Sequence, residues 1–230
     1  MHLSALPRLA AAAAFCLIYT ACTSEVDSVD HGSGHATSRI NGSLTIPAGR
    51  AAMDAETING RITLEPQASA ASVQTVNGAI QLGADAHAGT LATVNGDISL
   101  DSRARVDRSV ETVNGAIQLG RQAAVSGGLS NVNGAITLDA AQVGGVVDTA
   151  NGDITVGADS RVQGGLHVEP IHGHWLQLKA ARPPVIIIGP RAVVQGPLRF
   201  DRPVELHVSR QATIGPIQGA TPQTFDGDGP

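Results

Sequence analysis

The chain has 230 residues, a net charge of −5 at pH 7 and only 2% aromatic residues. Lys179 is the single lysine and the arginines are scattered, so no basic patch is available for nucleic acid or for an anionic membrane surface. The scarcity of aromatic side chains also argues against a sugar-binding cleft built from stacking rings.

The N-terminal segment, Met1 to Cys22, has the layout of a secretory signal peptide. Arg8 precedes an apolar run from Leu9 to Tyr19, and small residues surround Cys22. This run is too short to span a bilayer as a mature helix. We therefore expect the mature chain to be exported.

The segment from Leu17 to Cys22 resembles a bacterial lipobox, which implies cleavage before Cys22 and acylation of its thiol. Tyr19 stands where such motifs carry a branched aliphatic residue, so ordinary signal-peptidase cleavage after Cys22 or Ser24 is the alternative. Cys16 leaves with the signal. Cys22 would then be an unpaired thiol in an oxidising compartment, and this favours its modification.

Thr23, rather than an aspartate, follows Cys22. We therefore expect an outer-membrane lipoprotein that faces the periplasm and is held in the membrane by its N-terminal lipid. The alternative is a soluble periplasmic or secreted protein. Residues 23–38 are rich in Ser, Gly, Asp and His, which predicts a flexible tether.

The rest of the chain is dominated by a repeat that reads close to T-V-N-G-x-I-x-L. Two apolar positions after each glycine alternate with polar or small residues, as in a half-buried strand. A meander of hairpins is the commonest meaning of Asn-Gly, but it would not require the same residues in register at every repeat, whereas stacked coils do. The Asn-Gly pairs recur every 18 or 19 residues, beginning at Asn41, Asn59, Asn77, Asn95, Asn114, Asn133 and Asn151.

One repeat at ~3.3 Å per residue gives a perimeter of roughly 60 Å, enough for a three-sided coil. We therefore predict an all-β fold, a single-stranded parallel β-helix over residues 39–218. Its corner asparagines are expected to point inward, where stacked amides hydrogen-bond along the axis as a ladder. Replacing the amide of Asn114 with alanine should then cost roughly 1–3 kcal/mol. Each following glycine is needed for a positive φ or for a close backbone approach.

A third column of apolar residues continues beyond the last Asn-Gly pair. Its spacing is 18 to 20 residues except for a gap of 32 between Val162 and Val194. The gap predicts an insertion of about thirteen residues at 170–184. Residues 219–230 are polar and rich in Pro and Gly, and are expected to be a partial cap or a disordered tail. The column consists of Val106, Val125, Val143, Val162, Val194 and Ile214.

The T-V-N-G-D-I-x-L coil from Thr93 to Leu100 resembles a bacterial adhesin family of β-strand-repeat proteins, whose members are associated with the cell envelope and are mostly of unknown function. The resemblance covers roughly Arg39 to Val156. It implies a right-handed parallel β-solenoid and brings no catalytic residues. At the level of fold the chain is also similar to bactofilins, which are polymerising β-helices, although a secretion signal departs from their cytoplasmic setting.

Catalytic chemistry is weakly represented in the sequence. In the first outward column after each glycine the acids are Asp97 and Asp153, which are not in neighbouring coils, so the two-carboxylate geometry of glycoside cleavage is not supported. A zinc or copper site is conceivable at His167, His172 and His174, with His207 expected two coils above. A solvated insertion is the favoured interpretation, and we expect neither a metal nor another cofactor.

These observations predict a non-enzymatic, lipid-anchored solenoid that is a structural, adhesive or interaction element of the bacterial cell envelope. Its partners would be the membrane, through the lipid, together with an envelope polymer, a protein or a second copy of itself, and no nucleic acid. The alternative is a polysaccharide-active or polysaccharide-binding β-helix protein.

Overall fold

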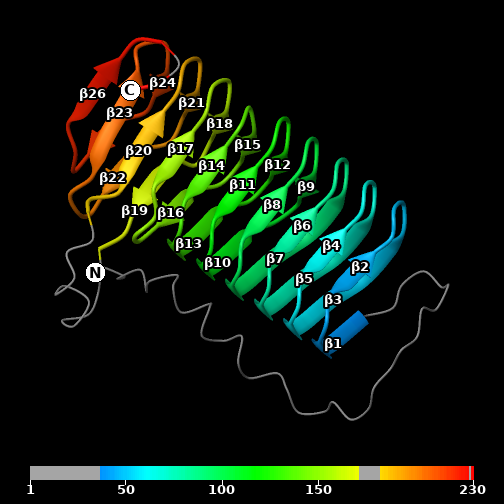
Figure 1. The fold of residues 1–230 in the computed structure, drawn as a ribbon. Helices are drawn as coiled ribbons and strands as arrows, with labels where there is room; N and C mark the ends of the chain where they lie inside the picture. The colour runs from blue at the N-terminus through cyan, green and yellow to red at the C-terminus, as the bar shows by residue number, and fades with distance from the viewer. Residues whose placement is uncertain (1–36, 171–181, 228) are drawn as a thin grey trace, which may run out of the picture. The chain divides into compact units, whose positions relative to one another are not determined.

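The computed structural model describes residues 37–170, 182–227 and 229–230, all within one compact unit, Ser33–Pro230. The predicted signal peptide, the predicted acylation site Cys22 and residues 23–36 of the predicted tether lie outside the described residues, as do His172 and His174. The described chain forms a β-solenoid whose parallel strands stack coil upon coil (Figure 1). No helix among these residues is long and apolar enough to cross a membrane.

One side of the solenoid is a ten-stranded sheet to which each coil contributes one short strand. Ile117 pairs with Ile98 in the preceding coil and with Ile136 in the next, so the predicted apolar columns stack in register. The sheet follows chain order: β2 (Leu44–Ile46), β4 (Ile62–Leu64), β6 (Ile80–Leu82), β8 (Ile98–Leu100), β11 (Ile117–Leu119), β14 (Ile136–Leu138), β17 (Ile154–Val156), β20 (Val185–Ile188), β23 (Glu205–Ser209) and β26 (Pro222–Phe225).

The other two sides belong to a sixteen-stranded sheet. The strands that lead to the corner before the ten-stranded sheet are β1 (Thr37–Asn41), β3 (Ala51–Asn59), β5 (Ser69–Asn77), β7 (His87–Asn95), β10 (Val110–Asn114), β13 (Leu129–Asn133), β16 (Val147–Thr149), β19 (Leu166–Val168), β22 (Leu198–Phe200) and β25 (Ile217–Gln218). The third side consists of β9 (Arg105–Val106), β12 (Ala124–Val125), β15 (Gln142–Val143), β18 (Arg161–Val162), β21 (Val193–Val194) and β24 (Thr213–Ile214).

All strand pairs among the described residues are parallel, which excludes the hairpin alternative for the Asn-Gly pairs. The third apolar column is confirmed by the same pairing, because Val106 lies beside Val125 and Val125 beside Val143. The predicted parallel β-solenoid is therefore the observed fold.

The lengthening of the repeat from 18 to 19 residues between Asn95 and Asn133 has a local cause. In β3, β5 and β7 one nine-residue strand runs along both sides of the sixteen-stranded sheet, and the buried Ala88 and Leu91 are three residues apart. From β9 onward a bend divides this strand, and the buried Val106 and Val110 are four residues apart. The extra residue therefore lies in the bend between the two shorter strands.

Inward-pointing side chains form one continuous aliphatic core. Ile98, Ile117 and Ile136 are each 0% exposed, and each stacks on the isoleucine of the neighbouring coil. Complete burial of such a side chain contributes about 1.5–3 kcal/mol, so the stack of columns supplies the main stabilisation. Because every column continues through neighbouring coils, the coils stabilise one another.

A tight turn joins the ten-stranded sheet to the third side in most coils. Ala86 N donates to Gly83 O at 3.1 Å across one of these turns. The third residue of the turn has a positive φ, the arrangement of a type II turn, and Pro66 and Pro190 occupy the second position that proline favours there. Non-glycine residues with φ between 57° and 63° hold this position in six coils: Gln67, Asp85, Arg103, Gln122, Asp159 and Arg191. Ala140, with a φ of 46°, lies in a bend that is one residue shorter.

The insertion interrupts one coil without disturbing its register. Ile154 pairs with Ile186, and Val162 pairs with Val194, across the inserted segment. Of the predicted insertion, residues 171–181 are outside the described part, while Pro170 and residues 182–184 flank them. The chain thus leaves the solenoid after β19 and returns at β20.

The solenoid extends beyond both predicted boundaries. Strand β1 begins at Thr37, within the predicted tether, and pairs with β3. At the other end β26 pairs in register with β23, so the expected tail supplies a further strand. The sequence did not predict this strand because the segment is rich in Pro and Gly. In the structure Pro222 begins the strand, and Gly219 adopts a positive φ just before it.

Candidate functional site

The corner asparagines form a ladder along the solenoid, but on its surface. Asn114 Nδ2 donates to Asn95 Oδ1 at 2.9 Å, and the same bond at 2.9 to 3.0 Å joins all seven asparagines in turn. Asn151 is half-buried and the other six are exposed, so the expectation of an inward ladder is wrong. Strand β10 ends at Asn114, and the chain turns there before strand alternation could bring the side chain inside.

Threonine, two residues before most of the asparagines, supplies the buried polar column instead. Thr112 is 4% exposed, and its hydroxyl donates to the carbonyl oxygen of Gly96 in the preceding coil at 3.1 Å. Thr57, Thr75 and Thr93 make the same bond at 3.1 to 3.3 Å. These hydroxyls satisfy carbonyl groups at the corner that would otherwise be desolvated without a partner.

The corner glycines are required chiefly for close backbone approach. A Cβ on Gly115 would overlap the carbonyl oxygen of Gly96, although the φ of Gly115 is not positive. Gly115 N also donates to Asn133 O in the following coil at 2.9 Å. The sequence allowed either a positive φ or a close backbone approach as the reason for these glycines. Among the corner glycines, a positive φ is found at Gly42 and Gly134.

Arg202 closes the acceptor end of the asparagine ladder. Its Nη1 donates to Asn151 Oδ1 at 2.7 Å and to Ala150 O at 2.8 Å. Partial burial lowers the pKa of the Arg202 guanidinium. Because every ladder amide donates toward the preceding coil, their dipoles align with the negative end at Asn151, where a cation is favourable.

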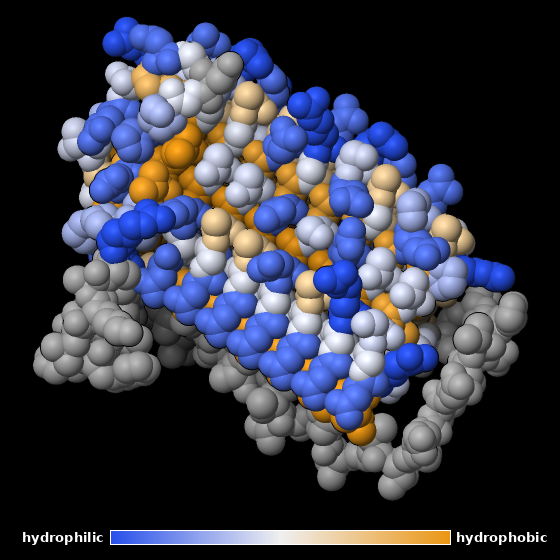
Figure 2. Space-filling model, viewed as in Figure 1, coloured by the Kyte–Doolittle hydropathy of each residue, from blue (hydrophilic) through white to orange (hydrophobic). Residues whose placement is uncertain are grey.

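An aliphatic stripe lies beside the ladder on the outward surface of the same strands. Its members directly precede the first six asparagines of the ladder. Ile40 is 49% exposed and the others are half-buried. Figure 2 shows rows of hydrophilic side chains crossing the coils with hydrophobic colour between them. The stripe is formed by Ile40, Ile58, Val76, Val94, Val113 and Val132.

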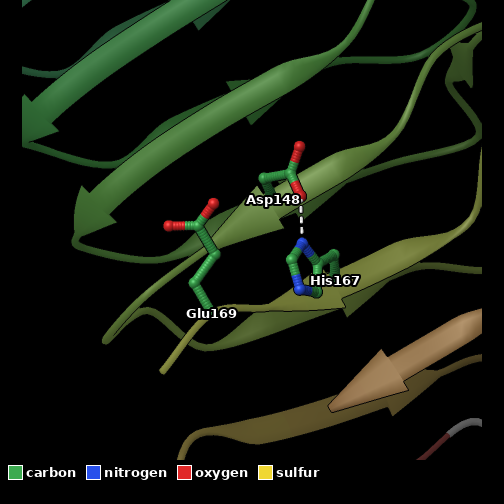
Figure 3. A group of neighbouring side chains, drawn as sticks. All are labelled: Asp148, His167 and Glu169. Carbon is green, nitrogen blue, oxygen red and sulfur yellow. Dashed lines mark hydrogen bonds and ion pairs between the residues drawn. The ribbon is translucent and has the colours of Figure 1, made fainter. Parts of the chain in front are cut away.

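Ionisable side chains gather on this surface where the insertion leaves the solenoid. Asp148 on β16 and His167 on β19 are register partners, and His167 Nδ1 lies 3.0 Å from Asp148 Oδ1. Asp148, His167 and Glu169 each offer a ligand atom, and these atoms all lie within 4.8 Å of one another. Figure 3 shows the Asp148 carboxylate and the His167 ring facing each other, with Glu169 beside them.

The other ring nitrogen of His167 faces a second aspartate. Nε2 lies 3.1 Å from Asp201 Oδ2, and Arg199 Nε donates to the other carboxylate oxygen of Asp201 at 2.9 Å. The Arg199 guanidinium first, and His167 second, hold the pKa of Asp201 below its ordinary value. The side chains of His167, Asp148 and Asp201 are only 21 to 28% exposed. Water therefore screens the contacts between them less than it screens the more exposed ion pairs.

The structure revises the predicted histidine cluster. His207 pairs with Ile187 in the ten-stranded sheet, whereas His167 belongs to the sixteen-stranded sheet, so His207 does not lie above it. The acids were missed because only the outward columns after glycine were compared between coils. The separation of Asp148 and His167 along the chain equals one coil, and this spacing could have revealed the pair.

A shallow cavity of about 360 Å³ lies over the third side of the solenoid. Its outward lining side chains are mostly amides with one guanidinium, contributed by β15, β18 and the ends of the neighbouring strands. Such groups can hydrogen-bond to a polar ligand. The polar lining consists of Ser126, Gln142, Arg161, Gln163 and Gln195.

Comparison of the chain with protein-family models, with curated proteins and with solved structures finds no match. By its fold, the described part of the chain is a parallel β-solenoid of repeating coils.

Proposed function

We propose that the protein is a non-enzymatic structural or adhesive element of a bacterial cell envelope, exported and anchored through an acylated Cys22. The observation that carries this proposal is the surface of the sixteen-stranded sheet. There the exposed asparagine ladder and the aliphatic stripe run side by side through six coils, from Ile40 to Asn133. A long, regular surface with polar and apolar rows suits contact with an extended or repetitive partner.

The internal use of side chains supports the same function. Most coils commit their isoleucine, leucine and alanine positions to the core, and five coils commit a threonine to the corner. From β2 to β17 the outward column of the ten-stranded sheet carries polar residues without acids paired between neighbouring coils, as Gln118 between Ser99 and Thr137 illustrates. Such a chain presents a surface, and the resemblance of its coils to adhesin-type repeats agrees with that role.

Localisation tests the anchor. Cells that express either the wild-type chain or Cys22→Ser are fractionated, and the envelope is washed with high salt and alkaline carbonate. We expect the wild type to stay in the outer-membrane fraction, since several acyl chains give stable anchoring. Cys22→Ser should appear in the soluble periplasm. Recovery of both in the soluble fraction would contradict the anchor and support a freely secreted solenoid.

The surface role is tested separately with purified outer membranes and cell-wall sacculi. Co-sedimentation of the mature chain is compared with that of Val94→Asp/Val113→Asp on the aliphatic stripe and Ser99→Asp/Gln118→Asp on the opposite sheet. Loss confined to the stripe variant supports the proposal, provided both variants melt like the wild type. Equal retention of all three would contradict it.

A second candidate function, polysaccharide binding, is favoured by the cavity over the third side. Gln142, Gln163 and Arg161 offer amide and guanidinium groups to sugar hydroxyls. The described aromatic residues Phe200 and Phe225 do not line this cavity, so binding would rely on hydrogen bonds without ring stacking. Retention on immobilised envelope polysaccharide that is lost in Gln163→Ala/Arg161→Ala, and kept in the stripe variant, would establish this alternative.

A further inference from the structure

His167 is placed between two carboxylates, and a neutral imidazole cannot satisfy both. Its Nδ1 lies 3.0 Å from Asp148 Oδ1 and its Nε2 lies 3.1 Å from Asp201 Oδ2. A neutral ring has one N–H donor and one lone pair. One of the two contacts would therefore oppose a nitrogen lone pair to a carboxylate oxygen, unless a cation or a second proton lies between them.

A neutral His167 has two tautomers, and the one with its N–H on Nε2 leaves Nδ1 able to bind a metal. Asp201 is held by Arg199 Nε at 2.9 Å on one oxygen and faces His167 Nε2 with the other. An ordered carboxylate of this kind fixes the N–H of the histidine on the nitrogen that it contacts. In the tautomer with its N–H on Nε2, the lone pair of Nδ1 points toward Asp148.

The Nδ1 side has the composition of a metal site. Asp148, His167 and Glu169 offer one imidazole nitrogen and two carboxylate oxygens, all within 4.8 Å of one another. Ligand atoms on a zinc ion lie about 2.0–2.2 Å from the metal, so neighbouring ligands are separated by about 3–3.5 Å. The 3.0 Å between Nδ1 and Asp148 Oδ1 agrees with this separation. The two ligand carboxylates also match the charge of a divalent ion.

We propose that Asp148, His167 Nδ1 and Glu169 bind one divalent transition-metal ion of the Zn²⁺ class. Imidazole with carboxylate ligands suits Zn²⁺, Ni²⁺ or Cu²⁺ better than Mg²⁺ or Ca²⁺, which prefer all-oxygen sites. Asp201 then acts outside the ligand set, where it orients the imidazole through Nε2. Three protein ligands leave a coordination position for water or for a donor atom of a partner.

The place of this site in the fold gives the ion a structural consequence. Asp148 belongs to β16, whereas His167 and Glu169 belong to the next coil, at the end of β19. The metal would link two adjacent coils at the point where the chain departs into the insertion. On the same surface the aliphatic stripe ends at Val132. The metal site would add a charged feature beyond that end. This inference does not depend on the proposed envelope role.

The test uses the mature chain without an affinity tag, titrated with ZnCl₂ at neutral pH by calorimetry, with MgCl₂ as the comparison ion. We expect one Zn²⁺ per chain and much weaker binding of Mg²⁺. His167→Ala and Asp148→Asn should abolish high-affinity binding. Asp201→Asn, which changes only the orienting group, should weaken it by about 10–100-fold.

Matched controls separate this site from other histidines. His87 contacts a single carboxylate, Asp107, at 2.8 Å, so His87→Ala should bind Zn²⁺ as the wild type does. His172→Ala/His174→Ala should also bind normally. Folding of every variant is checked by melting. The nitrogen-15 resonance of His167 Nδ1 should shift on addition of Zn²⁺, which a merely structural histidine would not show.

Three results would overturn the proposal. The first is absence of Zn²⁺ binding at millimolar concentration together with a doubly protonated His167 ring, which would assign the contacts to an imidazolium ion. The second is unchanged binding in folded His167→Ala. The third is binding that is lost in His172→Ala/His174→Ala and kept in His167→Ala.

Discussion

The side-chain amide of Asn131 donates to the carbonyl oxygen of Gly134 in its own coil at 2.6 Å. In four other coils a threonine holds this buried position and its hydroxyl reaches the preceding coil, as Thr112 does to Gly96 at 3.1 Å. Asn131 reaches the preceding coil less well, at 3.4 Å to Gly115 O. Its Oδ1 is buried and accepts no hydrogen bond from the described residues. The amide is therefore a poorer occupant of this position than a hydroxyl.

Asn131→Thr should consequently stabilise the protein. The substitution removes a buried unsatisfied oxygen, which costs about 1–3 kcal/mol, and it restores the hydroxyl bond between coils. We expect the free energy of unfolding to rise by about 1 kcal/mol and the melting temperature by about 2–4 °C. The reciprocal change Thr93→Asn should lower stability by a similar amount. A lower melting temperature for Asn131→Thr would show that the bond to Gly134 O is worth more than the unsatisfied oxygen costs.

Because the corner threonine is buried and the asparagine is exposed, replacing the threonine should lower the free energy of unfolding more than replacing the asparagine. Thr112→Val leaves the part-buried Gly96 O without its partner and should cost about 1–3 kcal/mol. Asn114→Ala removes two exposed ladder bonds, which water can partly replace, and should cost about 0.5–1.5 kcal/mol. Chemical denaturation of both variants measures the difference. If Asn114→Ala proved the more damaging, the ladder would be the principal polar stabilisation of the corner.

Repetition made the fold predictable from the sequence. A period of two within each strand and a nearly constant spacing between strands leave a single register in which Ile117 can lie between Ile98 and Ile136. The insertion could be located for the same reason, because Val162 and Val194 keep their column on either side of it. Strand alternation, by contrast, failed at Asn114, since it does not apply where the chain turns.

The candidate metal site was only partly predictable. His167 was recognised, but as a member of the cluster with His172 and His174. The acids that contact it lie 19 residues before and 34 residues after it, and they become neighbours only through coil register and the inserted segment. The type II turn column was also missed, because in six coils its positive φ residue is an aspartate, an arginine or a glutamine rather than a glycine.

Close approach of the backbones predicts unequal costs for two glycines in one coil. A Cβ at Gly115 overlaps the carbonyl oxygen of Gly96, which is held in the stacked corner, so Gly115→Ala should force two coils apart. At Gly120 the nearest atom is Leu100 O at 3.0 Å, and the equivalent position of other coils holds Asp101 or Asp139. Gly120→Ala should therefore be tolerated. Melting temperatures compare the two, and similar values would contradict the overlap.

Acid should weaken the ion pairs along the type II turn column. Arg103 and Arg191 each donate two hydrogen bonds, to Asp85 and Asp159 respectively, and hold the pKa values of these carboxyls below the ordinary 3.8. A carboxyl with a lowered pKa in the folded state adds stability above its unfolded pKa, and this is lost as the pH falls through the folded pKa. The contribution is small because both pairs are exposed. Melting temperatures from pH 7 to pH 2 should fall less steeply in Asp85→Asn/Asp159→Asn than in the wild type.

Cooperation between coils predicts that one core substitution destabilises several of them. Ile117 is fully buried between Ile98 and Ile136, so Ile117→Asp places a carboxylate in an aliphatic column and should cost more than about 4 kcal/mol. Gln118→Asp, on the same strand but exposed, should change stability by less than about 0.5 kcal/mol. Hydrogen exchange resolves the effect, because protection should fall in β8, β11 and β14 together. Loss of protection in β11 alone would show that the coils do not depend on their neighbours for stability.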